Sequence, residues 1–433
     1  MQGDSALSDL CELIADCPHS TPKWMDAGVP VLRSHNIRSG RLDLSDLSFT
    51  DEEHYKQRSR RVELKSGDLV ITREAPMGEV CRIPENLRCC MGQRMVLLRP
   101  DLSRCDGRFL LYAIQSPAVQ RQISWSEGTG STVSNLRIPH LKALRIPTPT
   151  LAEQRSIAAT LGVLDDKIEQ NHRTSQTLEE LARATFKAWF VDFEPVKAKA
   201  AGQSSFPGML ADTFAALPDR FADSPLGLVP EGWEATALSA TCQIVSGGTP
   251  KRSISDYWGG DIPWYSVKDA PEDGMPWVQI TGETITQAGL QGSAATLVPV
   301  GATIISARGT VGRLALAAQP MAFNQSCYGL LPIDGRSFCH LHLLLQHVVR
   351  KLKKMTHGSV FETITKQTFD SVSVIQALAP VIESFEQIVA PLFALQLASL
   401  KESAKLAELR DYLLPRLLSG QVRVNPGKTE AQL

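Results

Sequence analysis

The sequence has no uncharged apolar run of the roughly 18 residues that a membrane-spanning helix needs. Its first twenty residues carry four acidic side chains, whereas a secretory signal needs a basic start followed by an apolar run. Nine cysteines, an odd number, are scattered without a Cys-x-x-Cys pair, which argues against a disulfide framework and against a zinc site. We therefore predict a cytoplasmic protein whose thiols are buried.

Catalytic motifs are missing as well. The chain has no Gly-x-x-x-x-Gly-Lys-Ser/Thr phosphate loop, no Gly-x-Ser-x-Gly elbow, and no Asp or Asn before Pro-Pro-aromatic as in adenine methyltransferases. His340 and His342 are two residues apart, which places them on different sides of a helix rather than on one zinc-binding face. We expect neither a catalytic residue nor a metal or cofactor site in this chain.

An excess of positive charge is also absent, since 45 Lys and Arg residues face 46 Asp and Glu residues. Phosphate binding depends on basic side chains that release counterions, so the sum taken alone speaks against a nucleic-acid partner. The distribution matters more than the sum, and local basic runs occur at 56–61 and at 350–354. Either run, taken alone, is more simply explained as a solvated face.

What the sequence does contain is an internal repeat. Four segments of the first half recur in the same order in the second half, at offsets that drift only between 228 and 235 residues. Collinear matches of this kind are hard to obtain by chance, so we predict two copies of one unit of roughly 200 residues. The paired segments are 29–34 with 262–267, 66–73 with 300–308, 91–93 with 323–325, and 130–131 with 358–359.

Each copy divides into a globule and a long helix. The first part of each copy is rich in short β-branched and aromatic runs bounded by Gly, Pro, Asn and Asp, which is typical of strands and turns. The predicted fold class is α+β, with two similar globular domains, two long antiparallel coiled-coil helices between them, and a pseudo-two-fold internal repeat. The predicted boundaries are 1–150 for the first globule, 151–194 for the first helix, 195–225 for a linker, 226–375 for the second globule, 376–420 for the second helix and 421–433 for a flexible tail.

Both helices are predicted from positions that alternate by four and three residues, the spacing of a coiled-coil seam. Two isolated helices would expose these stripes to water, so the stripes are expected to pack on each other. In mid-helix, Asn171 and Ser175 are expected to face Ser399 and Glu402, where they either fix the register or are simply tolerated. The predicted seam positions are 157, 161, 164, 168, 171, 175, 178 and 182 in the first helix, and 388, 392, 395, 399, 402, 406, 409 and 413 in the second.

Several local motifs resemble those of the specificity subunits of type I restriction-modification enzymes, and the resemblance covers nearly the whole chain. Two positions depart from the family pattern. Residues 17–22 (CPHSTP) stand where a Gly-Gly-Thr-Pro is expected in the first copy, and the second helix carries its Glu-Gln pair shifted, at 386–387. The motifs are IPTPTLAEQRSIA at 146–158, WFVDFEPV at 189–196, VPEGW at 229–233, GGTP at 247–250, IPW at 262–264 and LLPRLLSG at 413–420.

The resemblance implies a function. Each globule would be a target-recognition domain that reads one half of a bipartite target in double-stranded DNA. The helices would dock two methyltransferase subunits and set the spacer between the half-sites. Restriction subunits, which carry the translocase and nuclease, could join, and S-adenosylmethionine and ATP would bind to the partner subunits. A non-catalytic coiled-coil scaffold for protein interactions is the alternative that the sequence leaves open.

Candidate DNA-contacting residues follow from side-chain chemistry and from the repeat. Arg, Lys, Asn and Gln can make the paired hydrogen bonds that distinguish guanine or adenine, and matched loops of the two copies would present them alike. Gln93 and Gln325 could instead close loops by bonding to backbone, and Arg73 and Arg308 could form exposed ion pairs of little energetic weight. The candidates are Arg33, His35, Asn36, Arg73, Gln93, Arg94, Ser131, Thr132 and Asn135 in the first copy, and Ser266, Lys268, Arg308, Thr310, Asn324, Gln325, Ser359, Thr363 and Lys366 in the second.

Overall fold

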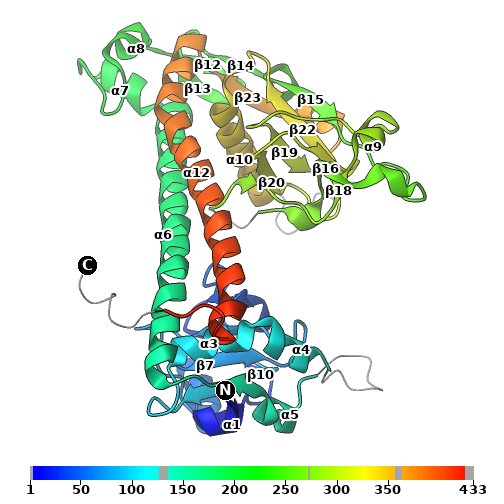
Figure 1. Ribbon diagram of the computed structural model, residues 1–433. Helices are drawn as coiled ribbons and strands as arrows, with labels where there is room; N and C mark the ends of the chain where they lie inside the picture. The colour runs from blue at the N-terminus through cyan, green and yellow to red at the C-terminus, as the bar shows by residue number, and fades with distance from the viewer. Residues whose placement is uncertain (1–2, 126–134, 272–273, 356–362, 425–433) are drawn as a thin grey trace. The chain divides into compact units, whose positions relative to one another are not determined.

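The computed structural model describes residues 3–125, 135–271, 274–355 and 363–424. The chain forms two compact units. Unit 1 comprises 1–168 and 404–433, and unit 2 comprises 169–403. Each unit therefore contains one globule together with parts of both long helices (Figure 1).

Unit 1 is built on an antiparallel sheet of β2 (Cys11–Asp16), β10 (Met95–Pro100), β7 (Leu69–Thr72) and β8 (Val80–Arg82), in that order. Because alternate residues of a strand face opposite sides, this sheet is buried on both. Leu69 and Leu98 pack with the covering helix α3 (Gly107–Gln115), whereas Val70 and Leu97 belong to a second core. That second core adjoins a smaller sheet of β6 (Ser48–Thr50), β3 (Val29–Leu32) and β9 (Cys90–Met91), in which β3 and β9 are parallel.

Unit 2 repeats this plan with one additional strand in its main sheet. Its main sheet has the order β15 (Cys242–Ser246), β22 (Cys327–Pro332), β19 (Thr303–Ser306) and β20 (Leu314–Ala317), followed by the short β17 (Trp277–Val278). Its second sheet is β18 (Thr284–Ile285), β16 (Trp258–Tyr265) and β21 (Ala322–Phe323), and β16 and β21 are again parallel. Helix α10 (Phe338–Met355) covers the main sheet on the side of the long helices (Figure 1). The predicted α+β class and internal repeat are confirmed.

A short antiparallel strand pair closes each globule directly before its long helix. In unit 1 it joins β1 (Asp4–Ala6) to β11 (Arg145–Pro147), and in unit 2 it joins β14 (Glu234–Ala237) to β23 (Ser373–Gln376). The first and last strands of each globule thus lie side by side. The remaining helices and strands are α1 (Leu7–Leu10), β4 (Ile37–Arg38), β5 (Arg41–Leu42), α2 (Glu52–Arg58), α4 (Pro117–Trp125), α5 (Ile138–Ala143), α9 (Gln287–Gln291) and α11 (Lys366–Ser371).

The two long helices are α6 (Leu151–Phe190) and α12 (Ala379–Leu418), each 40 residues long. They run antiparallel in both units. In unit 1, Asp165 Oδ1 accepts a hydrogen bond from Arg410 at 2.8 Å. In unit 2, Asn171 Nδ2 donates to Glu402 Oε2 at 2.8 Å, together with weaker bonds to Ser399 and Ser403. The expected facing of Asn171 and Glu402 is therefore confirmed.

The predicted seam is correct for α6 but one residue out of register in parts of α12. Every predicted α6 position is buried or half-buried. In α12, Leu395 and Leu409 are instead 50% and 45% exposed, and Gln396, Ser403 and Arg410 lie against α6. The error arose because α12 carries leucines on two faces. The apolar pattern favoured Leu395 and Leu409, whereas the adjacent polar residues face α6.

Helix α12 is also long and apolar enough to meet the length and composition test for a membrane span, with a mean hydropathy of 1.3 over its best window. Glu383, Glu386 and Lys401 interrupt its apolar sequence, so the expectation of no uncharged run of about 18 residues still holds. Its apolar side chains have partners inside unit 2, where Phe385 lies against the rings of Trp189 and Phe190. Packing within the unit therefore accounts for the composition of this helix.

The segment between the copies contains more structure than a bare linker. Helix α6 ends at Phe190, and Phe193 adopts a left-handed conformation (φ 55°) that starts α7 (Glu194–Ala200) in a new direction. The chain continues through α8 (Ala211–Ala216) and a hairpin of β12 (Phe221–Ser224) and β13 (Gly227–Pro230). Phe193 and Phe190 pack against Trp233, so the WFVDFEPV and VPEGW motifs together build one aromatic core.

Eight of the nine cysteines are buried and Cys11 is half-buried, so the prediction of buried thiols holds with that one exception. Burial raises the pKa of Cys11 to about 12 and that of Cys242 to about 11. At neutral pH these groups are therefore uncharged thiols, which pack as small apolar side chains.

Candidate nucleic-acid interface

Loops from both sheets of unit 1 meet at one edge of the globule. In an antiparallel sheet, one strand ends at the edge where the adjacent strand begins. Strands β7 and β2 therefore end, at Thr72 and Asp16, at the same edge where β10 begins at Met95. The parallel strands β3 and β9 also end together, and Gly92 N donates to Leu32 O at 2.7 Å. We call the loops that leave these strand ends, residues 17–22, 33–36, 73–79, 92–94 and 135–136, edge 1.

Unit 2 presents the corresponding loops on the same hydrogen-bonded frame. Asn324 N donates to Tyr265 O at 3.0 Å, as Gly92 does to Leu32. Three further pairs of bonds match: Gly78 N to Thr72 O with Gly312 N to Ser306 O, Leu136 N to Arg73 O with Ile364 N to Ala307 O, and Cys17 N to Met95 O with Gly247 N to Cys327 O. We call this set of loops, residues 247–250, 266–269, 307–313, 324–326 and 363–364, edge 2.

These bonds correct one predicted pairing. Arg73 occupies the backbone position of Ala307, and Arg308 occupies that of Glu74. The matched hairpin positions are Thr72 and Ser306, whose hydroxyls accept hydrogen bonds from Glu79 N and Arg313 N respectively. The two arginines looked equivalent because the segments 66–73 and 300–308 differ by one residue in length.

Arg73 holds edge 1 together from within. Its Nε donates to Leu136 O at 2.9 Å, Nη1 to Asp16 at 3.0 Å, and Nη2 to Asn135 Oδ1 at 3.2 Å. The side chain is only 14% exposed. All three guanidinium nitrogens thus have partners inside the globule, so the structure assigns Arg73 a role in shaping the edge.

The same network continues towards the surface. Asn135 Nδ2 donates to Glu74 Oε1 at 2.5 Å, and Arg94 Nε lies 3.1 Å from Glu74 Oε2. Arg94 is 58% exposed and has a positive φ of 65°, so its loop turns sharply outwards. The adjacent Gln93 is exposed and donates to His19 O at 2.5 Å, which is a loop-closing bond to backbone. Arg94 and Gln93 are therefore the exposed predicted residues at the tip of this loop.

In the neighbouring loop of edge 1, the predicted Asn36 already has partners inside the globule. Asn36 is fully buried, and its side chain accepts from Arg33 N at 2.8 Å and donates to the carbonyls of Asp43 and Asp46. It closes a loop rather than facing a ligand. Arg33 is exposed, with its guanidinium 5.4 Å from the ring centroid of the exposed Trp24, and His35 is half-buried beside Asp46.

Edge 2 carries a more open set of side chains. Arg308, Thr310, Lys268 and Gln325 are exposed, and no ion pair of Arg308 with a described residue is present. Thr249 donates its hydroxyl to Gln325 Oε1. The other candidates differ in exposure or lie outside the described residues: Ser266 caps a turn with Asp269, Asn324 is half-buried, Thr363 and Lys366 are exposed, and Ser131, Thr132 and Ser359 are not described.

Comparison with known proteins identifies the repeated unit. A protein family described as "Type I restriction modification DNA specificity domain" matches this chain twice, at residues 3–180 and at 230–409. Each match spans one globule and most of the long helix that follows it. The chain belongs to the type I restriction-modification DNA specificity family. We call its two matched segments specificity domains 1 and 2.

Relatives and a solved structure agree with this assignment. The HindI specificity subunit of Haemophilus influenzae is 27% identical over 402 residues, covering 83% of this chain and 87% of that protein. The MjaIX specificity subunit of Methanocaldococcus jannaschii is 26% identical over 391 residues, covering 86% and 81%. The crystal structure of a type I S subunit from M. genitalium shares the fold, with a TM-score of 0.53 at 17% identity, covering 96% of this chain and 95% of that one. DNA specificity, rather than scaffolding, is therefore the favoured role.

The Glu-Gln motif at the start of each long helix connects that helix to the one that covers its globule. The buried Gln154 accepts from Asp106 N and donates to Arg104 O and Pro149 O, which ties the start of α6 to the start of α3. In specificity domain 2, the shifted Glu386 accepts instead from the backbone of Cys339 and His340 at the start of α10. The same connection between long helix and covering helix is thus made by a different residue.

Sequence reasoning missed Arg58, an important residue of specificity domain 1. It lies in the charged run at 56–61 but is buried, with 6% exposure. Its guanidinium donates to Met91 O, Ser20 O and Pro18 O and so joins the two loops that carry His19 and Gln93. No local signal separated it from its solvated neighbours, because its partners are 33 to 40 residues away.

Proposed function

We propose that each specificity domain reads one half of a bipartite target in double-stranded DNA through its edge loops. Helices α6 and α12 hold two methyltransferase subunits and set the spacer between the half-sites. Restriction subunits can join this complex in the cytoplasm, and S-adenosylmethionine and ATP bind to the partner subunits. Family membership supports the DNA-recognition part of this proposal, and the edges support the division into two half-sites.

The single observation that carries the proposal is a shared backbone frame with different side chains. Edges 1 and 2 use matched hydrogen bonds to hold their loops. At matched positions, however, the chemistry differs: Arg73 is replaced by Ala307, Glu74 by Arg308, Arg94 by Ser326 and Asn135 by Thr363. Two loops of equal geometry and unequal chemistry suit two different half-sites, because sequence is read by donors and acceptors presented in a groove.

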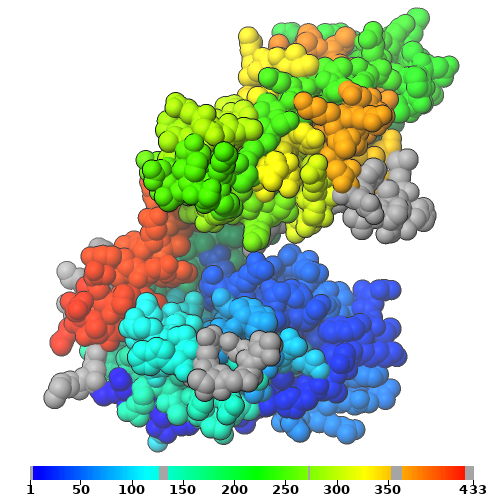
Figure 2. Space-filling view, turned by 90° about the vertical axis from the view of Figure 1, so that its right-hand side faces the viewer, coloured from blue at the N-terminus to red at the C-terminus, as the bar shows by residue number. Residues whose placement is uncertain are grey.

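Exposed apolar side chains on the long helices support docking of protein partners. In unit 2, Leu181 and Leu395 are 52% and 50% exposed, and in unit 1, Val163 and Tyr412 are 64% and 57% exposed. The last part of α12, red in Figure 2, lies uncovered on that face of unit 1. Apolar groups spread along both helices offer the kind of surface that partner subunits cover.

Arg308 gives the sharpest test because it is exposed and forms no ion pair with a described residue. The full chain, assembled with its methyltransferase partner, is bound to a library of DNA duplexes with randomised half-sites. The Arg308→Ala variant is expected to lose about 1 to 3 kcal/mol and to relax discrimination at one base pair of one half-site. Arg220→Ala, which removes an exposed arginine that belongs to neither set of edge loops, is the control and should leave specificity unchanged.

Two results would count against the proposal. If Arg308→Ala weakens binding equally for all sequences, Arg308 contacts a phosphate and not a base. If the assembled wild-type complex shows no sequence preference at all, the scaffold alternative replaces DNA reading.

A further inference from the structure

A cleft of about 300 Å³ lies between α6 and α10 within unit 2. Its apolar lining is formed by Phe186 and Leu343, both buried. The polar side chains around it are Arg183, Lys187, His347 and Arg350, with Glu180 as the one carboxylate in the lining. The cleft therefore combines an apolar lining with predominantly basic walls.

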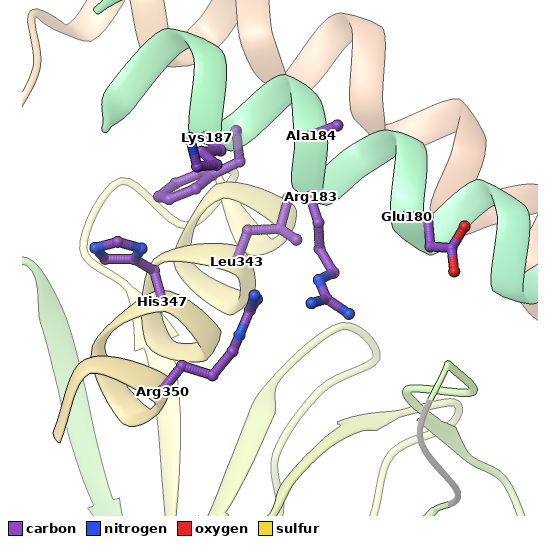
Figure 3. A pocket seen from close by; sticks show the side chains of 8 residues that line it. Glu180, Arg183, Ala184, Lys187, Leu343, His347 and Arg350 are labelled. Atoms are coloured by element: carbon purple, nitrogen blue, oxygen red, sulfur yellow. The ribbon is translucent and has the colours of Figure 1, made fainter. Parts of the chain in front are cut away.

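Helical spacing explains why these groups converge. Arg183 and Lys187 are four residues apart on α6, and Leu343, His347 and Arg350 follow at intervals of four and three on α10, so each set forms one stripe. The helices meet through the ring of Phe186, whose centroid is 6.4 Å from that of His347. Figure 3 shows the guanidinium groups of Arg183 and Arg350 directed into the same gap, with Glu180 lying apart from both.

The charges in the cleft are only partly balanced. Lys187 pairs with Asp192, but no ion pair joins Arg183 or Arg350 to a carboxylate among the described residues. Among the described residues, Arg350 makes two long hydrogen bonds, to Gln346 O and Oε1. Burial and then the charge of Arg183 lower the pKa of Arg350, while Glu179 acts in the opposite direction. Two like charges thus line the same cleft, the half-buried Arg183 and the more exposed Arg350.

A simpler explanation covers part of this cluster. Basic residues near the C-terminus of a helix interact favourably with its dipole, and Arg350 and Lys351 lie close to the end of α10. This accounts for their presence on α10. It does not account for Arg183, which belongs to another helix, lies two turns before the end of that helix, and points into the same cleft.

The position of the cleft indicates its ligand. A neighbouring cleft of about 350 Å³ is also lined by Arg183 and Arg350, together with the buried carboxylate Glu179 and with Gly312 and Arg313 of the β19–β20 hairpin. This hairpin belongs to edge 2 and carries Arg308. Three arginines, Arg183, Arg313 and Arg350, therefore line the cleft that joins the proposed base-reading hairpin to the long helix within unit 2.

We propose that Arg183 and Arg350 together bind a backbone phosphate of the DNA beside the half-site read by edge 2. The planar guanidinium group suits phosphate because it offers parallel N–H donors to two oxygens, and an anion between the two would offset their repulsion. On this view α6 contacts DNA itself in addition to spacing the domains. The inference rests on the proposed function.

The test measures the salt dependence of binding. The full chain is assembled with its methyltransferase partner, and affinity for a specific duplex is followed between about 50 and 200 mM salt. The Arg183→Gln/Arg350→Gln variant is expected to flatten the slope of log K against log salt by about one and to weaken specific and nonspecific DNA alike. Arg173→Gln, an exposed arginine on the same helix that pairs with Glu169, should leave the slope unchanged.

Two further measurements keep the result interpretable. Arg183→Lys/Arg350→Lys retains both charges and should preserve most of the slope, which separates loss of charge from loss of folding. Duplexes with single neutral methylphosphonates beside the second half-site should bind the wild type more weakly at one position, and that penalty should disappear in the Gln variant.

The outcomes distinguish this inference from the proposed function. If wild type reads sequence but the Gln variant keeps the wild-type slope, only the phosphate site is overturned. If the variant instead loses the methyltransferase subunit while its salt slope stays normal, the cleft binds an acidic protein surface and the inference is wrong. If wild type shows no sequence preference, the proposed function itself has failed.

Discussion

Two buried histidines on α10 should make specificity domain 2 sensitive to mild acid. His340 lies among the rings of Phe186, Phe190 and Phe385, and burial lowers its pKa to about 4. His342 is fully buried, is hydrogen bonded to Thr303 and Gln346, and has its pKa lowered to about 3 by burial. Both are neutral in the folded protein at pH 5.

The coupling between proton binding and folding sets the sign and size of the change in stability. In the unfolded chain each histidine takes up a proton near its ordinary pKa of 6.5, whereas the folded chain resists protonation until pH 4 or below. Stability is therefore complete above about pH 6.5 and is lost as pH falls towards the folded pKa. Between pH 6.5 and pH 5 each group is expected to cost about 2 kcal/mol, at about 1.4 kcal/mol per pH unit.

Hydrogen exchange of the full chain at pH 7 and pH 5, corrected for intrinsic rates, reports this loss separately for each unit. Peptides from α10 should lose protection at pH 5 relative to peptides from α3. His340→Phe preserves the ring contacts and removes one titrating group, so it should recover about half of the loss. The exposed His140→Gln in α5 is the matched control and should change nothing.

Glu386 acts in the opposite direction, because burial raises its pKa, and Asp334 lies close enough to His340 to raise the histidine's pKa slightly. Both groups are present in wild type and in His340→Phe. The difference between the two proteins therefore isolates the histidine. An unchanged loss of protection in His340→Phe would show that the buried ring is not the source of acid sensitivity.

Two further predictions concern the reading edges and the helices. Arg58→Lys retains the charge but cannot donate to Met91 O and Pro18 O together. Selection from randomised duplexes should therefore show relaxed discrimination in the half-site of domain 1 alone. Relaxation of both half-sites would contradict the local role of Arg58. Insertion of four residues into both α6 and α12 lengthens each helix by roughly 6 Å and rotates the segment beyond the insertion by about 40°. Methylome sequencing should then reveal a spacer longer by one or two base pairs with both half-sites unchanged, and an unaltered spacer in an active enzyme would exclude the helices as a ruler.

The repeat and the helices could be predicted from sequence because both are periodic features. The four-three alternation indicated two long helices, and the collinear segments indicated two similar globules. The register of α12 could not be obtained in this way, since Leu395 and Leu409 have the composition of a seam but face solvent. Only the hydrogen bonds of Gln396 and Ser403 reveal which face meets α6.

The structure brings most of the candidate loops together, but which of their residues contact DNA stays a prediction. Strand ends brought most of the candidate loops to common edges, as the repeat indicated. The role of an individual side chain depends on partners that are distant in sequence. Asn36 is hydrogen bonded to backbone carbonyl groups, and Arg73 is paired with Asp16, which is 57 residues away. Hydrogen-bonding capacity can be read from residue type, whereas whether that capacity is already satisfied depends on the fold.

The ion pair between Arg73 and Asp16 constrains how domain 1 can evolve. Replacing Arg73 alone would leave the Asp16 carboxylate, 19% exposed, without its guanidinium partner, and removing one member of a partly buried pair costs more than removing both. Domain 2 has Ala307 and Ser246 at the two matched positions, so there both charges are missing together. Replacement of Arg73 alone should therefore destabilise edge 1 more than replacement of Arg73 and Asp16 together, whereas the exposed Arg308, which has no ion-pair partner among the described residues, can be replaced alone without leaving a carboxylate unpaired.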